Sequence, residues 1–141
     1  MSAGGKSVVL LPCSGIGKVF GALARETMYE LVERVRPDTA VTLCLSLLVI
    51  NDPEATRLVR TSPVMTIDGC PKECARKSLE SLGVMAATAC QAIDFYKAHK
   101  DFKPEGIGEL DEPGRKLAAL AADELAEVVD RLAGRGLHHG N

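Results

Sequence analysis

Four of the five cysteines of this chain stand where the strands of a parallel β-sheet would end. Cys13, Cys44 and Cys70 each follow a short apolar run that is typical of a buried strand, and Cys74 comes four residues after Cys70. The intervals between the first three are roughly 30 residues, the length of one βα unit. Because parallel strands point the same way, the residues that follow them share one edge of the sheet. Thiols that are distant in sequence would therefore meet at that edge.

A cluster of thiolates of this kind would suit a soft metal ion. Structural zinc sites hold the ion in a tetrahedron of four ligands, and Cys is a favoured donor. We expect Cys70 and Cys74 to lie one turn apart at the start of a helix, whose N-terminus favours thiolate. Cys13 and Cys44 would complete the set if the first strand lies between the second and the third. The sequence therefore predicts a zinc site, and an iron–sulfur cluster is the alternative cofactor because it uses the same ligands.

Strands and helices are expected to alternate along the first two thirds of the chain. The predicted strands are residues 7–12, 39–46, 64–67 and 84–89, the last followed by Cys90, and residues 47–50 are either more strand or a buried turn. The predicted helices are residues 19–35, a helix that starts at 51–54 and ends near 60, and a helix that opens at Cys70 and is closed by Gly83. This pattern predicts a three-layer α/β fold with about four mainly parallel strands and flanking helices.

The alternation stops after about residue 97. We predict a cysteine-site domain over residues 1–97, and a C-terminal part over residues 98–141. That part comprises a linker at 101–114, an amphipathic helix at 115–132 and a disordered tail at 134–141. The apolar stripe of the helix should pack on the domain, or on a second copy of the chain (a homodimer) or another protein.

Composition excludes several classes of function. The formal net charge is −2 and aromatic residues make up only 4% with no Trp, so neither a phosphate-binding surface nor base-stacking platforms are expected, and we predict no nucleic-acid partner. The first apolar run is too short for a signal peptide or a membrane span. We therefore predict a cytoplasmic protein without membrane contact, whose thiols stay free or bind metal in a reducing compartment.

The cysteines stand in segments that are similar to a known family. Pro12-Cys13-Ser14-Gly15, then Cys44, then Asp68-Gly69-Cys70-Pro71 with Cys74, resemble the DGC-domain family, which takes its name from an Asp-Gly-Cys motif. The resemblance covers about residues 7–93, and the C-terminal helix lies outside it. It implies a zinc-binding domain with Cys13, Cys44, Cys70 and Cys74 as ligands, and it implies no particular cellular function.

Thiol chemistry is the second hypothesis. Cys70 at a helix N-terminus would be nucleophilic, with Cys74 or Cys13 as resolving thiol and Asp68 as base or hydrogen-bond acceptor, as in a redox or sulfur-transfer enzyme. A closed metal site would leave none of these thiols free to attack. Cys90 is expected to belong to the core rather than to the site.

Three further motifs give weaker indications of function than the cysteines do. Gly17-Lys18 follows a strand, but the flanking residues that a P-loop requires are absent. The interval from Cys70 to Arg76 matches the loop of cysteine phosphatases, although Glu73 would repel an anion there. His138 and His139 could bind metal only adventitiously, from a polar tail.

Overall fold

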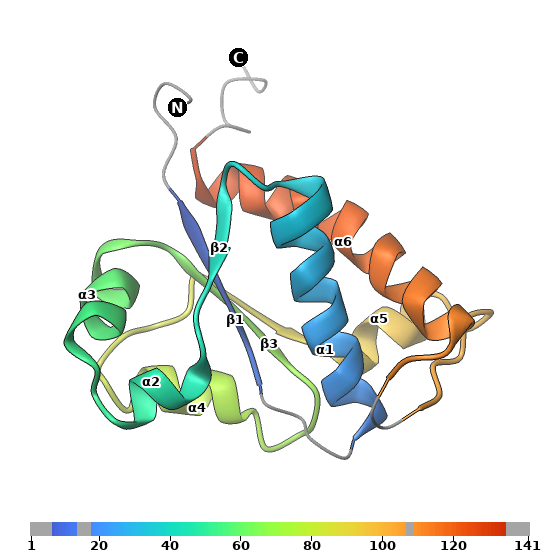
Figure 1. The fold of residues 1–141 in the computed structure, drawn as a ribbon, viewed down its shortest axis with the longest axis horizontal. Coiled ribbons are helices and arrows are strands. Elements are labelled where there is room, and N and C mark those ends of the chain that lie inside the picture. Colours follow the sequence, from blue (N-terminus) through green and yellow to red (C-terminus); the bar gives the residue numbers. More distant parts are fainter. Residues whose placement is uncertain (1–6, 14–17, 107–108, 135–141) are drawn as a thin grey trace.

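A parallel β-sheet with the strand order β2-β1-β3-β4 lies at the centre of the computed structural model, which describes residues 7–13, 18–106 and 109–134 (Figure 1). The strands are β1 (Val8–Pro12), β2 (Ala40–Thr42), β3 (Val64–Asp68) and β4 (Thr88–Gln91). Helices cover both faces of this sheet, so the predicted three-layer α/β fold is confirmed. β1 lies between β2 and β3, which is the order that brings the predicted ligand loops to neighbouring strand ends.

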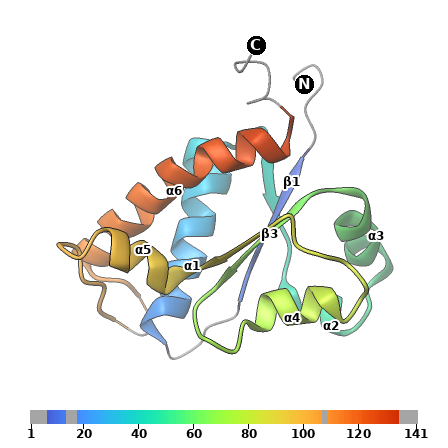
Figure 2. The same ribbon diagram turned by 180° about the vertical axis from the view of Figure 1, so that it is seen from behind.

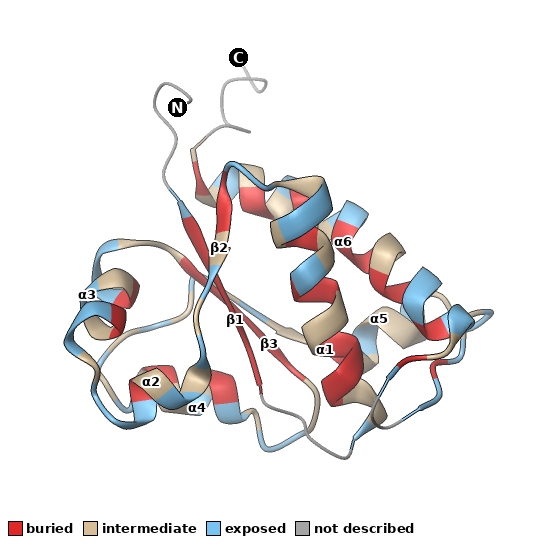
Figure 3. Cartoon of the chain, viewed as in Figure 1, coloured by how far each residue is buried: buried red, intermediate tan, exposed pale blue. Residues whose placement is uncertain are grey.

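The two faces of the sheet carry two separate apolar clusters. Val8 and Leu10 of β1 pack with the helices of one face, and Val9 and Leu11 pack with those of the other. The strand is buried over its whole length, which explains its continuous apolar sequence (Figure 3). The clusters fix the orientation of β1, and with it the position of Cys13 at its end.

One face is covered by α1 (Val19–Tyr29), which continues into a π-helical segment η1 (Glu30–Val35), and by α5 (Ala92–Ala98). The long helix α6 (Glu112–Leu132) packs against α1, η1 and α5, and both ribbon views show it running alongside α1 (Figures 1 and 2). The other face is covered by α2 (Leu45–Val49), α3 (Pro53–Thr61) and α4 (Cys74–Glu80). Asp52 caps α3 by accepting a hydrogen bond from the Ala55 amide at 3.0 Å, as the sequence predicted.

The C-terminal helix uses its apolar stripe within the domain. Leu117, Ala121 and Val129 are buried, and the guanidinium of Arg36 at the end of η1 makes a two-pronged ion pair with Asp130 at 2.8 and 2.9 Å. The helix begins three residues earlier than predicted because Asp111 caps it, accepting a hydrogen bond from the Gly114 amide at 2.9 Å. The buried part of the stripe therefore packs within the domain.

Two predicted strands have different limits in the structure. The second ends at Thr42, and the apolar residues after it form α2, in which Leu48 is buried and Val49 is 65% exposed; Ile50, which follows the helix, is 70% exposed. A short apolar run does not distinguish strand from helix by periodicity, and here the helix gives Leu48 a place in the core. The fourth strand runs over Thr88–Gln91 rather than residues 84–89, and because it ends later than predicted it includes Cys90.

α5, which follows β4 directly, is a helix that the sequence analysis did not identify. The predicted disordered tail, His138 and His139, and the loop residues 14–17 lie outside the described residues. Across the part of the chain that is described, no helix has the length and apolar character needed to span a membrane.

Candidate cysteine site

The predicted ligands all lie on the loops that leave the carboxyl ends of β1, β2 and β3. Cys13 directly follows β1, Cys44 lies between β2 and α2, Cys70 lies two residues after β3, and Cys74 is the first residue of α4. Their side chains open into different hollows. Cys13 and Cys44 line one cavity of about 470 Å³, Cys70 lines another of about 530 Å³, and Cys74 lines a groove of about 780 Å³. The fold therefore brings the four cysteines to one edge of the sheet, where they line different hollows.

Cys13 is held at the centre of this edge. It is 5% exposed, and its Sγ accepts a hydrogen bond from the Gly69 amide at 3.1 Å. Burial is the main reason why the pKa of this thiol is raised, and the bond from Gly69 opposes that rise. The contact links the loop after β1 to the loop after β3.

Cys44 has the opposite environment. Its thiol is exposed, and its Sγ lies 2.9 Å from the hydroxyl oxygen of Ser46. Hydrogen bonds from the side chain and backbone of Ser46 lower the pKa of Cys44. These hydrogen bonds favour the thiolate form of Cys44, which a metal ligand and a nucleophile both need.

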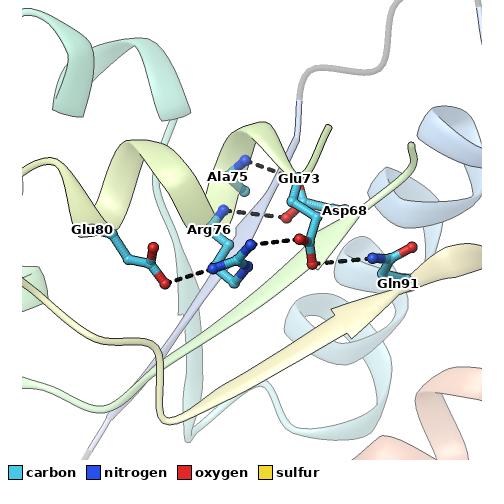
Figure 4. Close-up of polar contacts among 6 residues, drawn as sticks. All are labelled: Asp68, Glu73, Ala75, Arg76, Glu80 and Gln91. Atoms are coloured by element: carbon cyan, nitrogen blue, oxygen red, sulfur yellow. Dashed lines mark hydrogen bonds and ion pairs between the residues drawn. The ribbon is translucent and has the colours of Figure 1, made fainter. Parts of the chain in front are cut away.

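Asp68 caps the N-terminal end of α4, the helix that begins at Cys74. Its carboxylate is 2% exposed and accepts hydrogen bonds from the backbone amides of Ala75 at 2.8 Å and Arg76 at 3.2 Å (Figure 4). These amides belong to the first turn of α4, where backbone donors have no partner within the helix. Asp68 is thus a helix cap supplied by the preceding strand, and this role accounts for the acid in the Asp-Gly-Cys motif.

Gly69 is required by a close approach of two backbones. A Cβ atom at this position would lie 2.5 Å from the Cα and amide nitrogen of Gly21 in α1, and 2.7 Å from the carbonyl carbon of Phe20. No side chain larger than hydrogen fits without displacing the helix or the loop. The glycine therefore sets the distance between α1 and the Cys70 loop.

The predicted placement of Cys70 and Cys74 on one helical face is wrong. α4 begins at Cys74, and residues 70–73 form a turn in which the Glu73 amide bonds the Cys70 carbonyl at 3.1 Å. Glu73 precedes the helix in the left-handed conformation, with φ 54° and ψ 51°. The reason is that the capping carboxylate comes from Asp68, so the first helical turn is placed after Glu73 and not after Cys70. Cys70 consequently lacks the support of a helix N-terminus.

The guanidinium of Arg76 is engaged by two acidic side chains. Its guanidinium bonds Glu73 at 2.5 Å and Glu80 at 2.7 Å, and Glu73 also accepts a hydrogen bond from the Gln91 side chain at 3.0 Å (Figure 4). These contacts give no support to the oxyanion-loop interpretation of Cys70 and Arg76. The sequence offered no signal for Gln91, which reaches Glu73 only because β4 pairs with β3.

Cys90 lies in β4 and packs against the cluster around α1. Burial is the main cause that raises the pKa of its thiol to about 11, with a smaller contribution from Asp94. Within residues 7–13, 18–106 and 109–134, no three His, Cys, Asp or Glu side chains form a group that could hold a metal ion. The donor types and the shared edge suit zinc, and binding would require the cysteines to rearrange into a group that could hold the ion.

We expect the burial of Asp68 to be visible as a pH dependence of stability. Burial is the main cause that raises its pKa, so the folded state holds the proton more tightly than the unfolded chain, whose pKa is about 4. The stability gained from this tighter proton binding is fully present below the unfolded pKa of about 4, and it is lost as the pH rises through the pKa of Asp68 in the folded state. Asp68→Asn lacks the titrating carboxyl group, so in urea unfolding its stability should rise relative to that of the wild type as the pH increases above about 4.

A matched variant separates the charge from the cap. Asp68→Ala removes the acceptor for both amides of α4 and should lower the free energy of unfolding by about 1–2 kcal/mol at neutral pH. Equal stability of Asp68→Ala and Asp68→Asn at pH 7 would contradict the capping role.

Comparison with known proteins gives one match. The family model described as the DGC domain matches residues 9–112, which extends from β1 to the start of α6. No curated protein and no solved structure matches the chain.

Proposed function

This chain belongs to the DGC-domain family. Because the cysteines of this chain that match the motif lie at one edge of its sheet, we propose that it is a zinc-binding protein of the cytoplasm. The ligands would be Cys13, Cys44, Cys70 and Cys74. The observation that carries the proposal is the order β2-β1-β3, which sets the loops bearing all four thiols on adjacent strand ends. Thiolate sulfur is a donor that zinc accepts in closed four-ligand sites.

The surroundings of the thiols support this chemistry. Zinc binding displaces thiol protons, and Cys44 already has a lowered pKa. Lys72 lines the hollows of both Cys70 and Cys74, where its charge would offset that of the thiolates. When bound, zinc would tie the loops after β1, β2 and β3 together.

Metal analysis tests the proposal. Protein carrying His138→Gln and His139→Gln, and purified without a histidine tag, should retain about one zinc per chain after dialysis. The double substitution removes adventitious binding by the tail. Well under one zinc per chain would overturn the proposal, and a brown colour with visible absorption in anaerobic preparations would assign an iron–sulfur cluster instead.

A thiol-based redox or sulfur-transfer enzyme is the second candidate. The sequence pattern predicts Cys70 as the nucleophile of such an enzyme. In the structure, the exposed thiol with a lowered pKa is that of Cys44. We therefore expect Cys44 to react first with iodoacetamide in the metal-free protein near pH 8, and Cys13 and Cys90 last. Peptide mass spectrometry over a time course measures the order.

The same labelling experiment separates the two functions. If the cysteines are committed to zinc, labelling of Cys44 and Cys70 should be slow until a chelator is added. Fast labelling of one of them that a chelator does not change would favour the enzyme.

A further inference from the structure

Glu73 has a conformation that its residue type does not favour. It lies between Cys70 and Cys74 with a positive φ of 54°, and among the described residues Asn51 is the other non-glycine residue with a positive φ. Asn tolerates this region because its short side chain bonds locally, whereas Glu gains no such compensation. Contacts elsewhere must therefore hold Glu73 in place.

The holding contacts come from two different elements. The Glu73 carboxylate accepts from the Arg76 guanidinium of α4 at 2.5 Å through one oxygen, and from the Gln91 amide of β4 at 3.0 Å through the other. Arg76 is itself fixed by Glu80 at 2.7 Å. We call the group of Glu73, Arg76 and Gln91 the Glu73 clamp (Figure 4). Its side chains are partly shielded from solvent, which limits screening of the ion pair.

The clamp acts on the segment that carries two of the proposed ligands. With Glu73 held, the Glu73 amide closes a turn onto the Cys70 carbonyl, Cys70 opens into one hollow and Cys74 into another. A zinc ion would need both sulfurs about 2.3 Å away from it. Among the described residues no three His, Cys, Asp or Glu side chains form a group that could hold a metal ion, so binding requires these cysteines to rearrange, and Glu73 is the residue between Cys70 and Cys74 whose backbone angles are strained.

We propose that the Glu73 clamp is a positioning device that holds the Cys70–Cys74 segment in its metal-free arrangement and competes with zinc binding. The inference rests on the zinc function proposed above. A metal ion that binds the rearranged segment must break the contacts of Glu73 with Gln91 and Arg76, and its apparent affinity is reduced by the population of the clamped state. Weakening the clamp should therefore raise the affinity for zinc while it lowers the stability of the metal-free fold.

Gln91→Met tests this competition because it removes the amide donor and keeps a side chain of similar length. We expect the variant to bind zinc roughly fivefold to tenfold more tightly in competition with a chromophoric chelator. Its metal-free form should unfold at a lower urea concentration. The opposite signs of the two changes distinguish a competing clamp from a contact that merely supports the fold, since loss of simple support would weaken both zinc affinity and stability.

Glu30→Gln is the matched control, because it breaks an ion pair with Arg34 that involves no residue of the clamp, and its zinc affinity should stay within about twofold of wild type. Zinc binding by Gln91→Met that is equal to or weaker than wild type would overturn the clamp alone. Absence of zinc from the wild-type protein would overturn both the clamp and the proposed function. If Gln91→Met fails to fold, Gln91→Ala removes the same amide, and the same two results are expected of it.

Discussion

Replacing Cys70 with serine is expected to lower zinc affinity on the order of 100-fold or more while the sheet stays folded. Serine oxygen does not replace a thiolate as a zinc ligand, and loss of one donor opens a closed four-ligand site. Cys70 is only half buried, and it lies on a loop outside the two apolar clusters. Affinity is measured by competition with a chromophoric chelator, and the fold is followed by far-UV circular dichroism.

The matched control for this result is Cys90→Ser, which should retain zinc. Cys90 packs against the cluster around α1 and carries a raised pKa that disfavours thiolate. Cys44→Ser should behave like Cys70→Ser. If Cys90→Ser abolishes zinc binding while Cys44→Ser leaves it intact, the assignment of the four ligands is wrong.

The second large effect concerns Gly69, where alanine is expected to lower the free energy of unfolding by about 3 kcal/mol. The added Cβ would lie 2.5–2.7 Å from backbone atoms of Gly21 and Phe20, which is well inside normal van der Waals contact. A flexible side chain could relieve such a clash by changing rotamer, but the backbone of a packed helix cannot. Relief requires α1 or the Cys70 loop to move. The same shift would disturb the hydrogen bond from the Gly69 amide to Cys13. Urea unfolding of the metal-free protein measures the loss.

Gly83→Ala supplies the comparison. Nothing lies within 4 Å of a Cβ at that position, but the backbone has a φ of 79°, so the cost should come from conformation alone and be about 1 kcal/mol. A Gly69→Ala protein that is no less stable than Gly83→Ala would show that the approach of α1 to the Cys70 loop is not tight.

The Asp-Gly-Cys motif acquires a physical meaning from these contacts. Asp68 caps the helix that begins at Cys74, Gly69 permits α1 to lie against the loop, and Cys70 follows at the sheet edge. Two of the three residues are thus explained by packing and hydrogen bonding, independently of any metal. Cys70 is the member of the motif to which we assign the proposed metal chemistry.

Several features of the fold could be predicted from the sequence because local patterns determine them. The continuous apolar run of β1, the Asp52-Pro53 helix start of α3 and the periodic stripe of α6 each depend on residues close together in the chain. Alternation of these elements was sufficient to predict the parallel sheet and the edge on which the cysteines gather. The order β2-β1-β3 agrees with the arrangement that a shared cysteine site would need.

Other features depend on contacts between residues far apart, and the sequence by itself could not determine them. The start of α4 at Cys74 is decided by Asp68, whose burial at the end of β3 directs its carboxylate to the amides of Ala75 and Arg76. The contact of Gln91 with Glu73 exists because β4 pairs with β3. The close approach of Gly69 to Gly21 exists because α1 packs across β1 and β3. The edge at which the cysteines lie could therefore be predicted from local sequence. The turn between Cys70 and Cys74 and the Glu73 clamp arise only when strand pairing and helix packing bring distant residues together.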